Sequence, residues 1–331
     1  MYDVYGLGNA LVDMEFAIDD DFLARHDIPK GHMTLVDEAK IDALVGDLEN
    51  HAPERMSGGS AANTLIAVQA FGARTYYSCK VADDATGAYF LKDLADAGVV
   101  TNANAQDSNG KSGHCLVLIT PDAERSMNTF LGISSNLSTG EVDEAALAQS
   151  RYFYVEGYLS SSDAALQAAT TACQIARDNG VKTAVSLSDP SMVEFFRDNL
   201  TLILGNGVDH LFCNEEEALT WSGTDSLDLA IRELKDTARQ VNITLGAKGS
   251  LVVENNSQTL VPGNPVDAVD TTGAGDIYAG GCLYGWVSGM NAEQAAGLGN
   301  HAAAELVKRF GARYRHLDHY QETLQAFHNG G

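Results

Sequence analysis

The chain of 331 residues lacks the features that mark several classes of protein. It has only six prolines, and no apolar run approaches the roughly 20 residues that a membrane-spanning helix needs. Its N-terminus has no basic stretch followed by an apolar one, as a signal peptide would have. We therefore expect a cytoplasmic protein that has no membrane partner.

Cysteine is also sparse and scattered. The five cysteines include no Cys-x-x-Cys pair, and their number is odd. This pattern predicts reduced, mostly buried thiols, and it argues against a disulfide framework or a structural zinc site.

Basic residues are few in comparison with acidic ones. Forty-five acidic and 21 basic residues give a formal net charge of −24. Such a chain repels nucleic acid and anionic membranes, so neither is expected as a partner. An anionic ligand would need local positive potential, supplied by metal ions or by the N-termini of helices.

What the chain does contain is an alternation of short apolar strands and helices. Strands are expected at 2–9, 75–81, 152–156, 183–187 and 210–213, and helices at 60–71, 86–97, 164–177 and 193–199. Repeated βαβ units predict an α/β fold: a doubly wound, mainly parallel sheet with helices on both faces. We expect residues 1–331 to form one domain.

Two segments, near 14–36 and 112–132, break this rhythm. The first contains a short extended piece at 33–36. The second is typical of a hairpin, with strands at 114–120 and 126–131 joined by a Pro-Asp-Ala-Glu turn. A small β-strand lid inserted in the domain is the simplest interpretation.

The most informative stretch is Asp270–Asp276, DTTGAGD, followed by small and apolar residues typical of a helix. A Gly-x-Gly turn that opens a helix presents backbone N–H groups to an anion, and the helix dipole adds to their potential. We expect Gly273, Ala274 and Gly275 to form an anion hole for a phosphoryl group in transfer. Asp276 could accept the proton of an attacking hydroxyl. A tight turn with an ordinary helix-start aspartate is the alternative.

Two earlier runs carry similar glycine chemistry. In Ser57–Asn63, SGGSAAN, Gly58 and Gly59 let the backbone approach a ligand closely. We expect Ser60 to cap the helix that follows, with Asn63 in its first turn. The first strand runs through Gly6-x-Gly8 into the sequence NALVD. These two glycines lack the third glycine of a dinucleotide-binding fingerprint.

Together these runs resemble the signatures of the ribokinase (PfkB-type) family of carbohydrate kinases, with Cys282 standing where that family has another apolar residue. The matches follow the family order along nearly the whole chain. The resemblance implies transfer of the γ-phosphoryl group of ATP, with Mg²⁺, to a hydroxyl of a small molecule. It also implies that Asp13 receives two adjacent hydroxyls, which suits the two oxygens of a carboxylate.

The resemblance extends to the nucleotide. Asn214 and Glu217, in the run NEEE, look like the family element in which the glutamate holds magnesium through water. By the same resemblance the ATP-binding residues are Asn214, Thr244, Gly246 and Gly249 near the phosphates, and Asn300 beside the adenine. Asp270 and the carbonyl of Thr272 match a potassium site that some members of the family lack.

The acceptor is the least determined part. Several segments resemble adenosine-kinase-type members, in which Leu35 and Leu131 on the lid would contact the base of a nucleoside, with adenosine as the expected acceptor. Glu156 ends a strand near the place where ribokinases have a sugar-contacting glutamate, which keeps a simple sugar or sugar acid open as the alternative. The same sequence could also belong to a non-catalytic ligand sensor or, more remotely, to a dehydrogenase. Pairing of two chains through their lids would give a homodimer.

Overall fold

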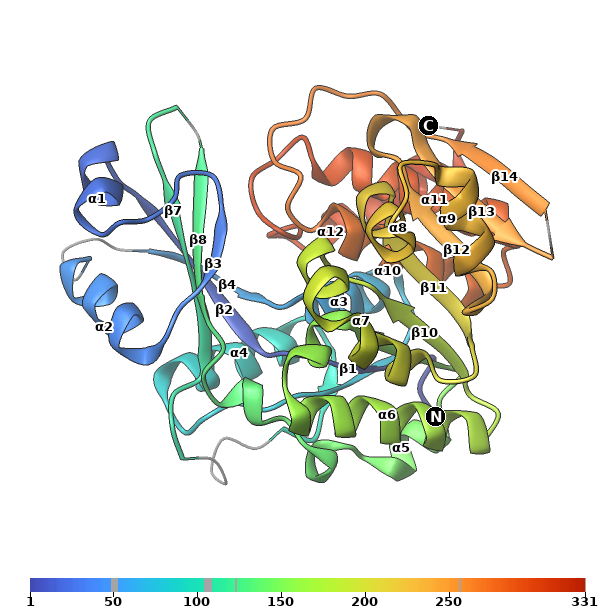
Figure 1. Ribbon diagram of the computed structural model, residues 1–331, viewed down its shortest axis with the longest axis horizontal. Helices are drawn as coiled ribbons and strands as arrows, with labels where there is room; N and C mark the ends of the chain where they lie inside the picture. Colours follow the sequence, from blue (N-terminus) through green and yellow to red (C-terminus); the bar gives the residue numbers. More distant parts are fainter. Residues whose placement is uncertain (49–52, 104–108, 123, 256, 331) are drawn as a thin grey trace.

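The computed structural model describes residues 1–48, 53–103, 109–122, 124–255 and 257–330. It contains a large sheet covered by helices and a smaller sheet that stands beside it, on the left in Figure 1. The smaller sheet, called the lid below, is built from segments of the first 130 residues.

The large sheet has the strand order β14-β13-β12-β11-β10-β9-β1-β5-β6. Every pair from β12 through β6 is parallel, and β13 and β14 add an antiparallel edge. The expected doubly wound, mainly parallel sheet is confirmed. The strands are β1 (Val4–Leu7), β5 (Thr75–Ser78), β6 (Val100–Thr101), β9 (Tyr152–Glu156), β10 (Lys182–Ser186), β11 (Val208–Asn214), β12 (Ala238–Thr244), β13 (Gly249–Glu254) and β14 (Ser257–Pro262).

Alternation of side chains along the buried strands gives the sheet two apolar faces. In β9, Tyr152 and Tyr154 join the core on one face, and Phe153 and Val155 join the core on the other. Helices α3, α10, α11 and α12 belong to the first side and helices α5 to α9 to the second. Their bounds are α3 (Ser60–Phe71), α5 (Glu144–Ala148), α6 (Asp163–Asp178), α7 (Pro190–Leu204), α8 (Glu215–Ser222), α9 (Leu227–Leu234), α10 (Ala274–Val287), α11 (Ala292–Leu306) and α12 (Asp318–His328).

The lid is a five-stranded sheet with the order β3-β8-β7-β2-β4. Both segments expected to form a lid contribute strands. The sequence did not predict β4, whose polar letters ERMSG show neither alternation nor a run of apolar residues. The elements are β2 (Leu11–Ala17), β3 (Met33–Leu35), β4 (Glu54–Gly58), β7 (Gly113–Ile119) and β8 (Arg125–Phe130), with α1 (Asp20–Arg25), α2 (Glu38–Asp47) and α4 (Ala85–Asp96) packed nearby; Ala123 in the hairpin turn lies outside the described residues.

Helix α3 begins at Ser60 and ends at Phe71, as expected, but its N-terminus differs from the prediction. The N-cap is Gly59, with φ of 98°, and not Ser60. A left-handed φ of this kind is readily adopted by glycine alone. Ser60 is thereby the first helical residue, and its hydroxyl is free for another partner.

Helices α3 and α10 cross at very close range. A Cβ added at Gly280 of α10 would lie 2.8 Å from the Cβ of Ala67 and 3.2 Å from the carbonyl oxygen of Thr64, both on α3. The absence of a side chain at Gly280 therefore sets the separation of the two helices. Both helices direct their N-termini at the same place, described next.

Candidate active site

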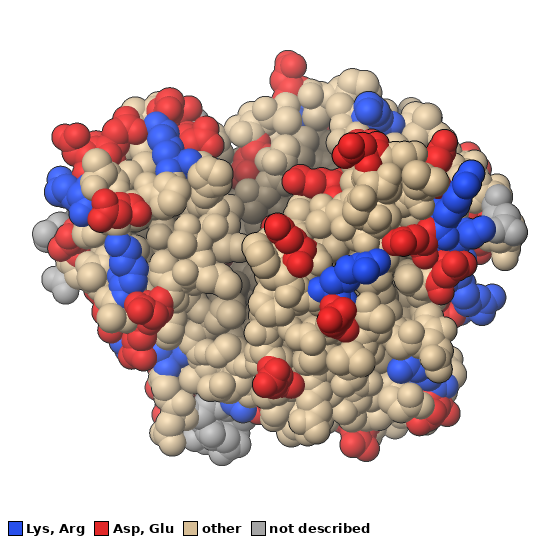
Figure 2. All heavy atoms as spheres, viewed as in Figure 1, with Lys and Arg blue, Asp and Glu red and all other residues tan. Residues whose placement is uncertain are grey.

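A cavity of about 890 Å³ lies between the lid and the large sheet. Figure 2 shows a hollow between these two parts, on a face where acidic side chains are spread widely. Residues at the carboxyl ends of five adjacent parallel strands border the cavity: Glu156, Ser186, Asn214 and Thr244 end their strands, and Asn9 lies two residues after β1. Ligands of open α/β sheets bind at this carboxyl edge.

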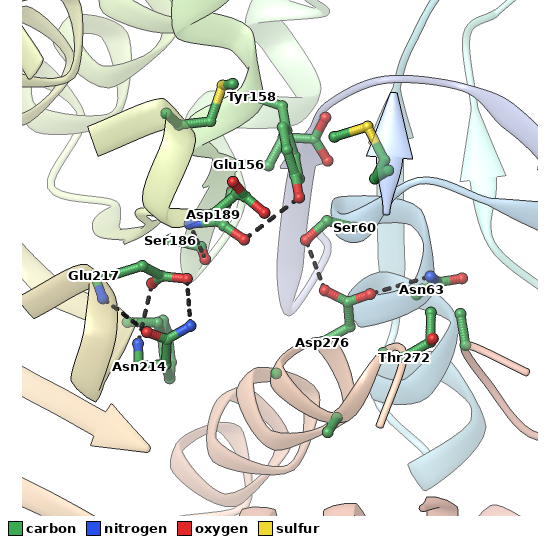
Figure 3. A pocket seen from close by; sticks show the side chains of 18 of the residues that line it. Ser60, Asn63, Glu156, Tyr158, Ser186, Asp189, Asn214, Glu217, Thr272 and Asp276 are labelled. Carbon is green, nitrogen blue, oxygen red and sulfur yellow. Dashed lines mark hydrogen bonds between the residues drawn. The ribbon is translucent and has the colours of Figure 1, made fainter. Parts of the chain in front are cut away.

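Asp276 lies in the first turn of α10, at the centre of the cavity (Figure 3). The Ser60 hydroxyl donates to its Oδ1 at 2.6 Å, and Nδ2 of Asn63 donates to its Oδ2 at 3.1 Å. Burial raises the pKa of Asp276 to about 6, and these two hydrogen bonds oppose the rise. A carboxylate with that pKa is ionised at neutral pH and can accept a proton.

The turn that opens α10 has the geometry of an anion site. Gly273 is its N-cap, with a left-handed φ of 74°, and a Cβ there would collide with the carbonyl oxygen of Ala312. A Cβ on Gly275 would meet no atom within 4 Å. Together with Ala274, both glycines border the cavity. The N–H of Ala274 donates to the carbonyl oxygen of Thr271 at 3.2 Å, and the other N–H groups of this first helical turn favour a bound anion there.

Asp13, on β2 of the lid, borders the same cavity. Among the described residues, no hydrogen bond reaches its carboxylate. Burial, and then the charge of Glu15, raise the pKa of Asp13 to about 7, whereas Arg313 and Arg125 lower it. Gly58 packs directly against this carboxylate, since a Cβ on Gly58 would lie 2.5 Å from Oδ2. Asp13 thus has acceptor capacity available for a ligand.

Glu156 is fully buried at 0% exposure, and protein donors engage both of its oxygens. Oε1 accepts from the backbone N and from Nδ2 of Asn9, both at 2.8 Å, and Oε2 accepts from the N of Ala61 at 2.7 Å. Burial raises the pKa of Glu156 to about 7. The carboxylate ties the end of β1 to the first turn of α3, and so it supports the segment that carries Ser60 and Asn63.

Apolar side chains form the lid wall of the cavity. Leu35 is 52% exposed and Met33 is 38% exposed, although both border a cavity, and Leu131 stands near them. Cys115 and Met127 complete this wall. Exposed apolar residues around a cavity are typical of a binding surface for an apolar group.

At the other end of the cavity, Asn214 and Glu217 begin α8. Asn214 caps the helix, its Oδ1 accepting from the N of Glu217 at 2.8 Å, and its Nδ2 donates to Oε1 of Glu217 at 2.8 Å. Burial, together with the charges of Asp189 and Glu216, raises the pKa of Glu217 to about 7. The three carboxylates create negative potential that a divalent cation would relieve.

Of the remaining predicted residues, Gly59, Thr244, Gly246 and Thr272 border the cavity. Gly58, Gly249, Asn300 and Asp270 are not part of its lining. Nδ2 of Asn300 donates to the carbonyl oxygens of Val261 and Pro262 at 3.0 and 3.2 Å. It therefore fixes the end of β14 and does not open onto the cavity.

Sequence reasoning missed three residues that the structure brings to this region. Ser60 is not the helix cap that its position suggested, and its hydroxyl donates to Asp276. Asn9 and Arg125 lie inside runs that drew attention for different residues. Asn9 could have been found, because it is the last residue of the expected strand 2–9, at the edge where ligands bind. The role of Arg125 depends on contacts across the fold that no local pattern reveals.

Comparison with known proteins gives a consistent result. The family described as pfkB family carbohydrate kinase matches residues 32–318. A structure of adenosine kinase from Sinorhizobium meliloti is 36% identical, with a TM-score of 0.88, covering 98% of this chain and 99% of that chain. A probable sugar kinase protein from Rhizobium etli CFN 42 is 30% identical, with a TM-score of 0.88 and 98% of each chain covered. The adenosine kinase of Saccharomyces cerevisiae is 28% identical, over 93% of this chain and 95% of its own.

No helix among the described residues is long and apolar enough to span a membrane. The five cysteines are all buried free thiols, as expected. With a family match over most of its length and a similar structure at 36% identity, the chain belongs to the pfkB family of carbohydrate kinases and is a phosphotransferase that acts on a hydroxyl group.

Proposed function

We propose that this kinase transfers the γ-phosphoryl group of ATP to the primary hydroxyl of a nucleoside, and that adenosine is its acceptor. The observation that carries the proposal is Asp276, held by Ser60 and Asn63 at the opening of the anion turn. In this position one carboxylate can accept the proton of the attacking hydroxyl while the backbone of Gly273, Ala274 and Gly275 stabilises the transferring group.

The acceptor end of the cavity supports a nucleoside. Asp13 has free acceptor oxygens for a ribose diol, with Gly58, Gly59 and Asn63 around it. The apolar lid wall, which includes Leu35 and Leu131, would cover a base, whereas a free sugar has no apolar part that needs such a wall. Glu156, the residue that favoured a simple sugar, already accepts three hydrogen bonds from the protein. The adenosine kinases from Sinorhizobium meliloti and yeast are in line with this choice.

The nucleotide end supports MgATP. Thr244 and Gly246 border the cavity beside Asn214, with Gly249 and Asn300 supporting the turns behind them. The residues fit magnesium held through water, because the charges of Asp189 and Glu216 act on Glu217 and carboxylate oxygens suit this hard cation. When bound, magnesium would neutralise charge on the phosphates. Glu217 would orient the water molecules of that ion.

The test is release of ADP from MgATP across a panel of acceptors: adenosine, inosine, guanosine, ribose, fructose and 2-keto-3-deoxygluconate. We expect turnover with adenosine and little with the free sugars. 5′-Deoxyadenosine is the matched control, because it retains the base and the diol but lacks the primary hydroxyl. It should compete with adenosine and release no ADP. Efficient turnover of a free sugar, with adenosine inert, would contradict the proposal and favour a sugar kinase.

A homodimer through the lid would use an edge of the small sheet, where β3 and β4 are the outer strands. Exposed strand edges can pair with a second copy. Light scattering coupled to size exclusion, on the full chain with and without ligands, measures the assembled mass. A monomer at all concentrations would exclude this pairing.

A further inference from the structure

The carboxylate of Asp270, which begins the run DTTGAGD, is completely surrounded by protein donors. Oδ1 accepts from the N of Thr272 at 3.0 Å, and Oδ2 accepts from the N of Gly311 at 2.8 Å. Nη1 of Arg125 lies 3.0 Å from the same Oδ2. The side chain of Asp270 is 4% exposed, so these contacts leave it no face toward solvent.

Arg125 reaches this place from the lid. It is the first residue of β8, its side chain is 12% exposed, and its guanidinium lies between two carboxylates. Nη2 pairs with Glu15, on the neighbouring part of the lid, and Nη1 pairs with Asp270. The Phe310 ring lies below the guanidinium, 5.7 Å from its carbon. Within the described part of the chain Nη1 makes no aligned hydrogen bond, so its contact with Asp270 is an ion pair.

This arrangement does not fit the potassium ion expected at Asp270 and the Thr272 carbonyl. A potassium ion at this carboxylate would have to share it with a guanidinium 3.0 Å away. Two cations that share one buried carboxylate repel each other strongly. We propose that the Arg125 guanidinium occupies the electrostatic position of the monovalent cation, so that this kinase needs no potassium.

A small neighbouring cavity of about 30 Å³ supports the proposal. Thr272 borders it, together with the carboxylates of Asp13, Glu15 and Glu54 and the guanidinium groups of Arg55, Arg125 and Arg315. The three negative charges are matched by three positive ones. The cavity therefore presents no excess of negative charge that would hold a monovalent cation.

The ion pair also supports the anion turn. Asp270 orients the N of Thr272, directly before Gly273, and the N of Gly311, directly before the Ala312 carbonyl that faces Gly273. The positive charge of Arg125 beside Asp270 would offset the negative charge of this carboxylate, which would otherwise weaken the positive potential of the anion hole. A bound cation would have the same effect. Since that charge belongs to the lid, Arg125 acts as a positioning residue that couples lid and turn.

The proposal rests on the proposed phosphoryl transfer at this site, so its test does not depend on the acceptor. Binding of MgADP to the full chain is measured by calorimetry while potassium chloride replaces choline chloride at constant ionic strength. ADP release with the best acceptor is measured in the same series. We expect both to stay unchanged. Severalfold tighter binding or faster turnover in potassium would overturn the proposal, whatever the acceptor proves to be.

The variant Arg125→Met removes the charge but keeps much of the volume. We expect MgADP affinity and turnover to fall by about tenfold or more, because truncation leaves Asp270 buried and unpaired. Potassium, and not choline, should then restore part of the loss. Lys30→Met is the control: Lys30 also belongs to the lid segment, where it pairs with Asp20 and Asp122, and it lines neither of the two cavities. It should show no response to potassium.

Crystals soaked in thallium(I) give a readout that needs no activity and no binding assay. The proposal predicts no anomalous peak at Asp270 in the natural protein and a peak there in Arg125→Met. If that variant does not fold, Arg125→Lys replaces it and should stay insensitive to potassium, because the charge is kept. A thallium peak at Asp270 in the natural protein would overturn the proposal.

Discussion

The hydroxyl of Ser60 and Oδ1 of Asp276 lie 2.6 Å apart, although the residues are separated by 216 positions in the chain. The hydrogen bond joins the first turn of α3 to the first turn of α10. It stabilises the ionised carboxylate, and so it partly offsets the effect of burial on the pKa of Asp276.

The first prediction concerns the pH dependence of turnover. Since the pKa of Asp276 is about 6, kcat/KM should rise through an acid limb near that pH. Ser60→Ala removes a hydrogen bond to the charged form, so the pKa rises and the limb moves to higher pH. Turnover above pH 8 should change little. An unshifted limb in Ser60→Ala would contradict the role of this hydrogen bond.

Asp276→Asn should bind ligands and lose about 10³-fold in kcat.

The second prediction compares the two glycines of the anion turn. A methyl group at Gly275 would enter open space at the cavity, so Gly275→Ala should fold normally but weaken ATP binding and turnover. A methyl group at Gly273 would collide with backbone, so Gly273→Ala should lower the melting temperature. Thermal unfolding and steady-state kinetics separate the two effects. Equal losses of stability in both variants would contradict this assignment.

The third prediction is that the Asp13 carboxylate lowers the unfolding free energy and also binds the acceptor. The pKa of Asp13 in the folded chain, about 7, is above its ordinary value of 3.8. Above pH 7 the carboxylate is ionised in both states, and its charge costs more free energy in the folded chain than in the unfolded chain. Asp13→Asn should therefore raise the unfolding free energy at pH 8 by up to about 4 kcal/mol. The acceptor KM should rise by about tenfold or more. A variant that is less stable, or that has an unchanged KM, would refute the idea.

The fourth prediction distinguishes two roles of Glu156. If this residue supports α3, Glu156→Gln places an amide N–H₂ among donors from Asn9 and Ala61, and it should cost about 1–3 kcal/mol of stability. Both kcat and stability would then fall together. If Glu156 contacts the acceptor instead, KM should rise at constant stability. Chemical denaturation and kinetics on the same preparation decide between these outcomes.

The fifth prediction concerns acid stability. His210 is stacked on Trp286 with ring centroids 3.8 Å apart, and among the described residues neither ring nitrogen has a hydrogen-bond partner. Burial lowers the pKa of His210 from 6.5 to about 4. Between these values the unfolded chain binds a proton that the folded chain does not, so stability falls as the pH falls.

His210→Phe keeps the stacking and removes this titration. Relative to the variant, the natural protein should lose up to about 3 kcal/mol of unfolding free energy between pH 6.5 and pH 4. Buried carboxylates with raised pKa values act in the opposite direction, but they are common to both proteins and cancel. Parallel pH profiles for the two proteins would contradict the prediction.

From the sequence we predicted five of the nine strands of the large sheet, β1, β5, β9, β10 and β11, because they are short apolar runs; strands β6, β12, β13 and β14 were not predicted. The sequence predicted β9 at Tyr152–Glu156 and α3 at Ser60–Phe71 with the observed bounds. Strand β4 was missed, since its half-exposed, polar sequence carries no such pattern. Its pairing with β2 comes from the tertiary fold and not from local preference.

For the site, the sequence indicated the segments better than the contacts. Asp276 and the glycines around it follow from the chemistry of a helix N-terminus. By contrast, the hydrogen-bond partners of Glu156 lie 95 and 147 positions away along the chain. The ion-pair partner of Asp270 is Arg125, which belongs to the lid. No periodicity or spacing records such pairs, so the sugar contact at Glu156 and the potassium site at Asp270 stay predictions of the resemblance.

Gly280 has a consequence for how this enzyme could vary. The residue touches no ligand, yet the bare backbone at its position lets α10 lie against Ala67 and thereby brings Asp276 within reach of Ser60 and Asn63. The position of the proton-accepting carboxylate is thus set about one helical turn away, in the interior of the molecule. Substitutions that change the size of residues where α3 and α10 cross would alter catalysis, although every ligand-contacting side chain would stay the same.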